Sequence, residues 1–472
     1  MSVKEAFKKI SSFLPEVAPP KRKLALRRRL IWTGIVVIIY LIMGEIPLYG
    51  VTYGGADPFG FARIIFASRR GTLLELGIGP IVTAGLIMQL LAGAEIIKFD
   101  FTDPEERAIF TAATKLLTII VTIVESMAFV YAGLIRFKQT TPPLSVISVA
   151  FLQLVIATLI LMLLDEMVQK GWGIGSGISL FIAVGVSQTI FWDIFSPISV
   201  GGEPYGIIPY VIYLVASGDN IGKAFIRHAN YPSILALIAT IIVTILILYA
   251  EGIRIELPIS YARYRGIRSR YPVKLLYVSN IPVILTSTLM TDIYMISQII
   301  WSRFNTDNNN LLLNLIGMFE YQNQSIRVVG GLAYYITPPS DIFAAAQEPL
   351  RAIAFLIFMI LFSILFAVLW VEVGGLSAER VSQQLIDAGM QIPGFRRRAY
   401  SITILLGRYI PVVTIIGGFF VGLIAGAAQL VGVFGSGMGI LLTVDILMNY
   451  YQLLMREQIE ELYPALSRIL KV

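Results

Sequence analysis

Long apolar runs dominate the chain and set its fold class. A helix needs about 20 apolar residues to cross the hydrocarbon core of a bilayer. Four runs of suitable length contain no charge at all, and they cover Gln139–Leu164, Gly171–Trp192, Ala229–Ala250 and Ala352–Val371. Each of these runs predicts a membrane-spanning helix.

Four more runs contain one acidic residue each and still predict a span. They are the run that opens at Leu30 and meets Glu45, Gly71–Ala94 with Glu75, Leu116–Ile135 with Glu125, and Leu275–Ser302 with Asp292. The last run starts at Tyr409 and has no charge before Asp445, which is too long for one crossing. A break at Gly435-Ser436-Gly437 divides it in two, so the sequence predicts ten spans.

Composition agrees with this class and excludes ordinary soluble enzymes. The 472 residues are 56% hydrophobic and 14% charged, with a mean hydropathy of +0.77. Soluble domains are about 45–50% apolar and about 25% charged. The chain has no cysteine and one histidine, His228, which excludes disulfides, thiolate or histidine metal sites and histidine-dependent triads. We expect no cofactor.

The distribution of positive charge predicts the topology. An even number of spans places both termini on one side, and most of the 37 Lys and Arg residues fall on that side, which is then cytoplasmic. Basic residues precede Leu30 without a cleavage pattern, so we expect no signal peptide. The predicted parts are a cytoplasmic segment 1–29, an N-terminal half 30–193, an outer connection 194–230, a C-terminal half 231–455 with basic loops 251–274 and 375–408, and a cytoplasmic tail 456–472.

Two pairs of breaks indicate an internal repeat. Gly173–Ile178 and Gly435–Ile440 both have the form G-x-G-x-G-I, and the second and seventh spans contain Pro80 and Pro282. Spans two and five thus correspond to spans seven and ten. Five spans per half make the repeat inverted, which is typical of a path between the halves. Gly and Pro also serve ordinary packing and kinks in membrane helices, which is the alternative for each motif alone.

Aliphatic residues follow the breaks in all four spans. They are Ile78 and Val82, Ile178 and Ile182, Ile284, and Leu441 with Leu442. A ring of such side chains could close a path by excluding water and ions. Simple packing between helices is the alternative. The membrane acids Glu75, Glu125, Asp292 and Asp445 form no recognisable relay or metal cluster.

Several sequence segments resemble the SecY family of protein-conducting channels, and they are most similar to archaeal members. They occur in the family's order at Ala67–Gly85 with Met88–Leu91, Lys170–Ile182, Arg270–Leu275 with Tyr277–Leu285, Pro393–Arg396 and Leu441–Val444. The resemblance implies an all-α polytopic membrane protein, with ten helices in two inverted halves around a central pore. It implies the pore subunit of the translocation channel, which passes secretory polypeptides across the membrane and releases transmembrane segments sideways.

The resemblance also implies roles for particular residues. The pore ring would be Ile78, Val82, Ile178, Ile182, Ile284 and Leu442, the last ambiguous by one position with Leu441. The plug, a short segment that blocks the closed pore, would be residues 57–68 with Phe59, Phe61, Ile64 and Ile65. The lateral gate would lie between spans two and three and spans seven and eight, with Thr83, Gln89 and Asn280 as its polar groups.

Two dense basic patches lie in the predicted cytoplasmic loops. One contains Arg263, Arg265, Arg268, Arg270 and Lys274, and the other Arg396, Arg397 and Arg398. Such loops could orient the chain and touch anionic lipid, or bind the phosphates of ribosomal RNA. The resemblance implies docking of the ribosome or a cytosolic motor. It also implies two small single-span companions, one SecE-like and one beta subunit, together with signal sequences, nascent polypeptides and the plasma membrane.

Two other functions remain open at this stage. A secondary transporter would need polar groups near the breaks, where this sequence has aliphatic residues. A membrane hydrolase would need paired catalytic residues, and Asp292 with Asp445 is the one pair available. We expect no catalysed chemistry. Energy must come from a partner, because no P-loop or comparable nucleotide motif is present. Outer loops 195–230 and 303–351 have no assigned task, although Ile207–Val215 and Leu311–Phe319 could form short helices on the outer face.

Overall fold

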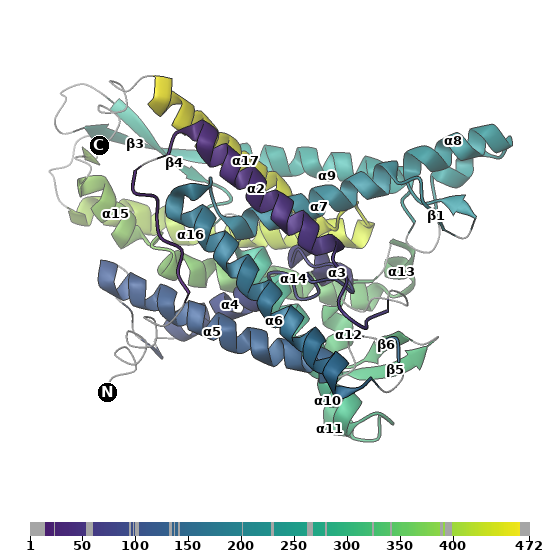
Figure 1. The fold of residues 1–472 in the computed structure, drawn as a ribbon. Coiled ribbons are helices and arrows are strands. Elements are labelled where there is room, and N and C mark those ends of the chain that lie inside the picture. Colours follow the sequence, from purple (N-terminus) through teal and green to yellow (C-terminus); the bar gives the residue numbers. More distant parts are fainter. Residues whose placement is uncertain are drawn as a thin grey trace.

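Long helices pack side by side in one bundle (Figure 1). The computed structural model describes residues 15–22, 24–52, 60–93, 96–97, 99, 103–131, 135, 137–139, 142–200, 202–227, 231–261, 268–278, 281–322, 325–339, 342–387, 390–391 and 399–462. Within these residues, ten helices correspond to the ten expected spans: α2 (Leu26–Glu45), α4 (Gly79–Gly93), α5 (Pro104–Tyr131), α6 (Leu144–Met167), α7 (Gly177–Phe195), α9 (Ile234–Gly252), α10 (Ile281–Phe304), α14 (Pro349–Val373), α16 (Ala399–Val431) and α17 (Gly437–Leu462). Eight are long and apolar enough to cross a membrane alone, and α2 and α4 complete the set.

Helices α4 and α10 begin later than their apolar runs. Residues Gly71–Ile78 form turns, so α4 starts at Gly79, and α10 starts at Ile281 rather than at Leu275. Proline has no backbone N–H to lose in a first helical turn. Pro80 and Pro282 thus lie inside the helices of spans two and seven, as expected, and each is the second residue of its helix.

The other two broken helices begin at a shared Gly-Ser-Gly string. Helix α7 starts at Gly177 and α17 at Gly437, and the glycine two residues earlier has a positive φ in both, +74° at Gly175 and +66° at Gly435. The two G-x-G-x-G-I strings are therefore offset by two residues from the structural equivalence. Ser176 is structurally equivalent to Ser436, whereas a letter-by-letter alignment of the two strings would pair it with Met438.

A side chain from the preceding span caps each of these two helix starts. Asp165 at the end of α6 accepts a hydrogen bond from the backbone N–H of Ile178 at 3.0 Å. Gln429 at the end of α16 accepts one from the N–H of Gly437 at 3.1 Å. The first N–H groups of a helix have no partner inside it. In both halves, a side chain at the end of the preceding span thus accepts a hydrogen bond from a backbone N–H at the helix start.

The bundle has two distinct ends. At the terminal end, where α2 begins and α17 ends, strands β3 (Arg254–Tyr261), β4 (Arg268–Lys274) and β7 (Met390–Gln391) form a three-stranded sheet beside η1 (Val168–Trp172) and α15 (Ala378–Asp387). Strand β3 pairs with β4 along its length and with β7 at Ser260 and Tyr261. The two basic loops of the sequence therefore meet in one sheet.

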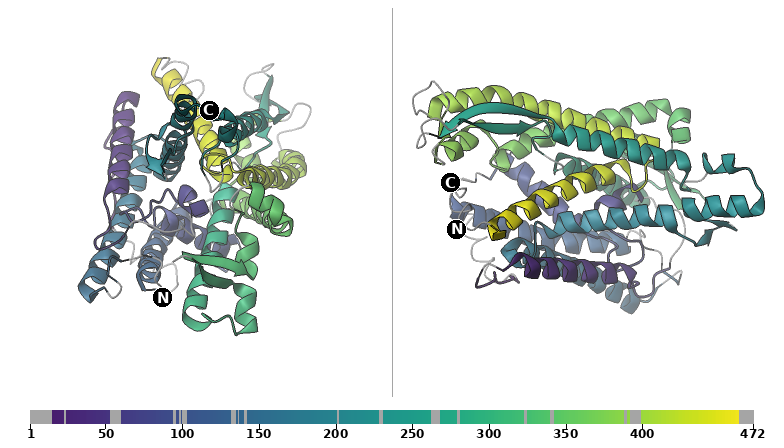
Figure 2. Two further views of the ribbon diagram at one scale, coloured as in Figure 1. Left: turned by 90° about the vertical axis from the view of Figure 1, so that its right-hand side faces the viewer. Right: turned by 90° about the horizontal axis from the view of Figure 1, so that it is seen from above.

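The opposite end carries the elements of the two outer loops (Figure 2). They are β1 (Ser199–Val200), β2 (Glu203–Pro204), α8 (Ile207–Ser217), η2 (Ile221–Ala224), α11 (Leu311–Ile316), β5 (Met318–Gln322), β6 (Ser325–Gly330), α12 (Leu332–Ile336) and α13 (Ile342–Gln347). The short helix expected over Ile207–Val215 is confirmed as α8. The second stretch is helical only to Ile316 and continues as a strand.

Close backbone packing depends on Gly177 and Gly437. A Cβ added at Gly177 would lie 2.5 Å from Asp165 Cα, and one at Gly437 would lie 2.3 Å from Gln429 N. Alanine at either position would force the helix start away from the preceding span.

We predict that Gly177→Ala and Gly437→Ala each destabilise the protein by about 1–3 kcal/mol, the usual cost of overpacking. The midpoint of thermal unfolding in detergent would fall. Gly34→Ala in α2 is the matched control, because no atom lies within 4 Å of its added Cβ. An unchanged midpoint in both test variants would contradict the close approach.

Candidate functional site: the junction between the halves

The largest buried apolar cluster lies where the two halves meet, and it contains the whole predicted ring. Ile78, Ile182 and Leu442 are fully buried, and Val82 is 8% exposed. Ile178 and Ile284 are partly buried and pack against the same cluster. Four helices and the residue before α4 therefore bring these six side chains together.

The helix starts fix the ring positions in both halves. Val82 and Ile284 each lie two residues after the proline of their helix. Ile182 and Leu442 each lie five residues after the first glycine of theirs. The equivalence favours Leu442 over Leu441 as the ring residue. The inverted repeat thus places one aliphatic side chain per helix at corresponding positions.

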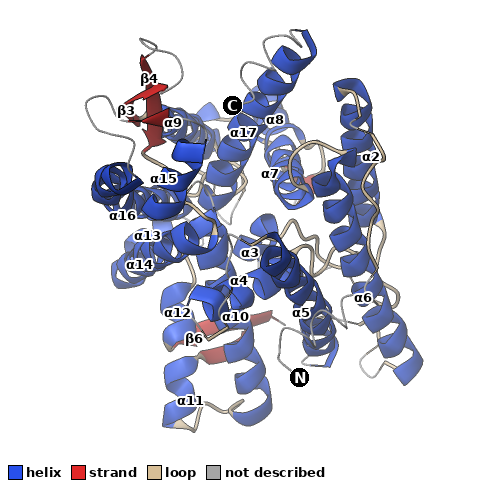
Figure 3. Ribbon diagram, turned by 90° about the vertical axis from the view of Figure 1, so that its left-hand side faces the viewer, coloured by secondary structure: helices blue, strands red, loops and turns tan. Residues whose placement is uncertain are grey.

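Helix α3 (Gly60–Ile65), the described part of the predicted plug, lies near the centre of the bundle (Figure 3). It packs against α7, α10 and α17. Ile65 is fully buried, and Ile64 approaches Gly439 so closely that an added Cβ there would lie 2.9 Å from Ile64 Cγ2. Phe59 lies outside the described residues, and for Phe61 only its place in α3 is described.

Polar contacts hold this segment in place. Arg63 pairs with Glu75 at 2.7 Å, with side-chain exposures of 12% and 3%. Tyr40 donates to the carbonyl of Ala67 at 3.0 Å, and the N–H of Ile78 donates to the carbonyl of Phe66 at 2.8 Å. The segment is thus connected both to α2 and to the turn that leads into α4.

Among the described residues, a direct polar contact joins α4 to α10 across the seam between the halves. The hydroxyl of Thr83 donates to Asp292 of α10, 3.3 Å from the nearer carboxylate oxygen. Gln89 is partly buried further along α4, and Asn280 lies outside the described residues. Thr83 is a predicted gate residue, and nothing in the sequence pattern connects it with Asp292, 209 residues away.

A small cavity beside the plug gathers the charges of this region. Arg63, Glu75, Glu125 and Asp292 all line it. Three of the acids noted in separate spans therefore converge in space, although nothing in their spacing along the chain indicates it. Asp445 does not line this cavity; its carboxylate accepts a hydrogen bond from the side chain of Asn449 at 3.2 Å. The pair that a hydrolase would need, Asp292 with Asp445, is not assembled.

The opposite end of the bundle opens into a cavity of about 870 Å³. Ile64 of the plug segment and Ser436 at the start of α17 line its inner part, while Arg227, Arg327 and Arg351 are among its polar lining residues. Helix α3, which carries Ile64, therefore borders this cavity.

The basic sheet at the terminal end is described in part. Arg270 pairs with Glu256 at 2.5 Å across β3 and β4, and this hydrogen bond lowers the pKa of the Glu256 carboxyl. Lys274 lies 3.7 Å from Glu251. Arg268 belongs to β4, and Arg263, Arg265, Arg396, Arg397 and Arg398 lie outside the described residues.

Comparison with known proteins agrees with this geometry. The family model described as SecY matches residues 72–451. The chain belongs to the SecY family. A second model, described as the plug domain of Sec61p, matches residues 38–71, so the SecY-family assignment extends to the segment in front of α4.

Relatives and solved structures cover the whole chain. The protein translocase subunit SecY of Pyrococcus furiosus is 40% identical, over 99% of both chains. A solved structure described as that of a protein conducting channel has a TM-score of 0.80 and 39% identity over 97% of this chain and 98% of the other. Sec61 in the canine ribosome-channel complex has a TM-score of 0.78, with 38% identity over 97% of this chain and 98% of that one. The fold is that of the SecY and Sec61 channels, and the chain is a multi-pass membrane protein.

We predict that Arg63→Gln loosens the plug segment. The change leaves the carboxylate of Glu75 buried without its guanidinium, and breaking a buried pair costs about 3–5 kcal/mol. The resting ion conductance of the protein in planar bilayers should rise at least about tenfold, which corresponds to about 1.4 kcal/mol. Lys223→Gln, a 55% exposed cation on η2, is the control and should leave the conductance unchanged. Equal conductance in all three proteins would show that the pair does not hold the plug.

Proposed function

We propose that this SecY-family chain forms the polypeptide path of a protein translocase, with the aliphatic ring as its constriction. The observation that carries the proposal is the convergence of six aliphatic residues, from both halves, beside the plug segment. Aliphatic side chains offer no coordination to a small solute, and a narrow apolar constriction excludes water and ions. The ring can therefore close around a moving chain of variable sequence.

The seam between α4 with α5 and α10 with α14 is the proposed lateral gate. Its polar contact, Thr83 to Asp292, is long at 3.3 Å. Interhelical hydrogen bonds in membranes contribute only about 0.6 kcal/mol on average. A hydrophobic signal helix could thus displace this contact and leave the path sideways into lipid. Gln89 and Asn280 are proposed as further polar groups of the seam.

The plug segment, residues 57–68, would leave the ring when the path opens. Phe59, Phe61, Ile64 and Ile65 are its proposed apolar contacts. The match of the Sec61p plug-domain model to residues 38–71 supports this role. The cavity on the opposite side of the plug would receive the emerging polypeptide.

The terminal end is the proposed cytoplasmic side, with the N- and C-terminal segments on it and the plasma membrane as location. The excess of basic residues on this side supports the orientation. Arg263, Arg265, Arg268, Arg270 and Lys274 with Arg396, Arg397 and Arg398 would bind phosphates of ribosomal RNA. Structural relatives include Sec61 in a ribosome-channel complex and yeast Ssh1 bound to the 80S ribosome, which supports a ribosome as partner.

The chain would act without catalysing a reaction, and the machine that feeds it would supply the energy. Small single-span subunits, one SecE-like and one beta subunit, would complete the channel. The parts proposed for this work are the N-terminal half 30–193, the C-terminal half 231–455, and the connection 194–230 between them.

We predict that photocrosslinkers at Val82 and Ile284 both react with a ribosome-stalled secretory chain in membranes. Both positions lie in the ring, two residues after the proline of α4 and of α10. Ile245 in α9 is the matched control, since it is 61% exposed on the lipid side and should not react. Disabling the signal sequence should abolish both crosslinks. Bound ribosomes without crosslinks at either ring position would contradict a path through the ring.

We predict that charge reversal at Arg268, Arg270, Arg396 and Arg397 weakens ribosome binding. Each lost phosphate contact should reduce the slope of log affinity against log salt by about 0.7–0.9. Arg254→Glu, at the far end of β3 and 59% exposed, is the control within the same sheet. If the quadruple variant keeps the wild-type affinity and salt slope, these residues do not bind the ribosome and serve only to orient the chain in the membrane.

A further inference from the structure

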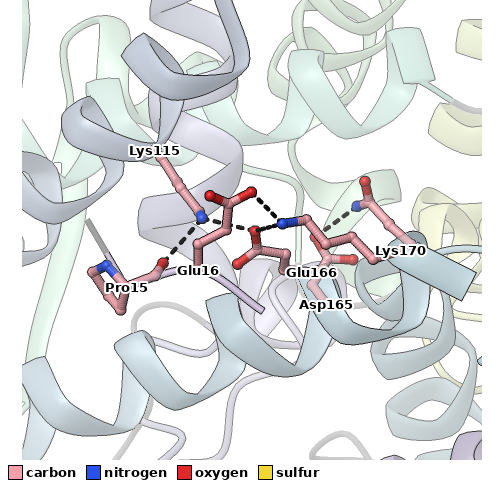
Figure 4. Close-up of polar contacts among 7 residues, drawn as sticks. Pro15, Glu16, Lys115, Asp165, Glu166 and Lys170 are labelled. Atoms are coloured by element: carbon pink, nitrogen blue, oxygen red, sulfur yellow. Dashed lines mark hydrogen bonds and ion pairs between the residues drawn. The ribbon is translucent and has the colours of Figure 1, made fainter. Parts of the chain in front are cut away.

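A second polar network lies at the terminal end, away from the ring and the basic sheet (Figure 4). Residues 15–20, here called the strap, accept hydrogen bonds from side chains of α5 and η1 through backbone carbonyls. Lys115 of α5 donates to the carbonyl of Pro15 at 3.0 Å, and the indole of Trp172 donates to the carbonyl of Ala18 at 2.8 Å. Trp172 also packs edge-on against Trp32 of α2, with ring centroids 5.4 Å apart. The strap is thus fixed at two points.

Glu166 at the end of α6 is the centre of this network. Its Oε1 accepts from Lys115 at 2.8 Å and pairs with Lys170 at 2.9 Å, and Lys170 also pairs with Glu16 of the strap. Lys115 and Glu166 are only 16% and 13% exposed. Charge-assisted hydrogen bonds of this kind are stronger than exposed ion pairs.

The neighbouring residue, Asp165, makes a separate set of contacts. Its carboxylate accepts from Gln169 at 2.7 Å, from Ser176 at 3.3 Å and from the N–H of Ile178 at 3.0 Å. Ile178 is a ring residue in the first turn of α7. Two adjacent acids thus hold different partners: Glu166 holds α5 and the strap, and Asp165 holds the helix that carries part of the ring.

We propose that Lys115 and Glu166 are positioning residues that hold the gate helix α5 in its resting place beside α6, and that the strap locks this contact. The proposal rests on the proposed lateral gate. For α5 to shift relative to α6 when the seam opens, Lys115 must give up both of its acceptors, namely Glu166 and the carbonyl of Pro15. Because Asp165 holds α7 independently, the gate can open without moving the start of the ring helix.

The test measures the width of the seam directly. The chain has no cysteine, so two introduced cysteines accept nitroxide labels without background. Ile120 in α5 and Leu365 in α14 are exposed apolar positions on opposite sides of the seam. In nanodiscs with the full chain, Lys115→Met should raise the population at longer distances about tenfold, which corresponds to about 1.4 kcal/mol. Glu166→Gln should act in the same direction.

Matched variants distinguish loss of the Lys115–Glu166 contact from general destabilisation of the protein. Lys115→Arg should keep the wild-type distribution. The double variant of Lys115→Met and Glu166→Gln should open no further than the stronger single variant, since the two residues share one contact. A reference pair at Ile156 in α6 and Ile245 in α9 should not change. If Lys115→Met fails to fold, Trp172→Phe removes the hydrogen bond to Ala18 while keeping an aromatic ring near Trp32, and it should shift the distribution in the same direction.

The possible results distinguish the lock from the gate. A wild-type distribution in Lys115→Met, with opening of the wild type by an added signal peptide, would overturn the lock and leave the gate standing. Equal opening in Lys115→Arg and Lys115→Met would also overturn it, because charge would not be the cause. A wild type that does not respond to a signal peptide would overturn the gate and the lock together.

Discussion

The structure depends on how it satisfies backbone groups at helices that begin inside the bundle. A free N–H or C=O is costly away from water, so an interrupted helix in a membrane needs a partner for each exposed group. Asp165 and Gln429 supply acceptors at the starts of α7 and α17. The helices α4 and α10 place proline in their first turn, where an N–H would otherwise be unpaired. Val82 and Ile284 then follow their prolines by two residues, and Ile182 and Leu442 follow their first glycines by five.

This arrangement separates apolar and charged functions over a short distance. The ring is aliphatic, while the charges of Arg63, Glu75, Glu125 and Asp292 gather in one cavity beside it. A passing polypeptide would meet only apolar side chains at the constriction. The contacts that decide whether the path is open lie next to the ring, where they can respond to a displaced plug or a separated seam without changing the seal.

Hydropathy and charge predicted the ten helices, because the length of an apolar run is a direct consequence of bilayer thickness. The packing of Val82, Ile182, Ile284 and Leu442 in one cluster could be anticipated because each follows a Gly or Pro break. The register of the repeat was not, since matching G-x-G-x-G-I by letters paired Gly177 with Gly439. Only the positive φ of Gly175 and Gly435 identifies Gly-Ser-Gly as the equivalent unit. The approach of Asp292 to Thr83, 209 residues apart, depends on helix packing that no local pattern encodes.

The pairing of β3 with β7 has a mechanical consequence. Strands β3 and β4 precede α10, and β7 precedes α16, so the whole sheet is attached to the C-terminal half of the chain. A large particle seated on this sheet would pull or push on that half alone. Movement at the seam would then fall to helices of the N-terminal half, such as α5, which carry no part of the sheet.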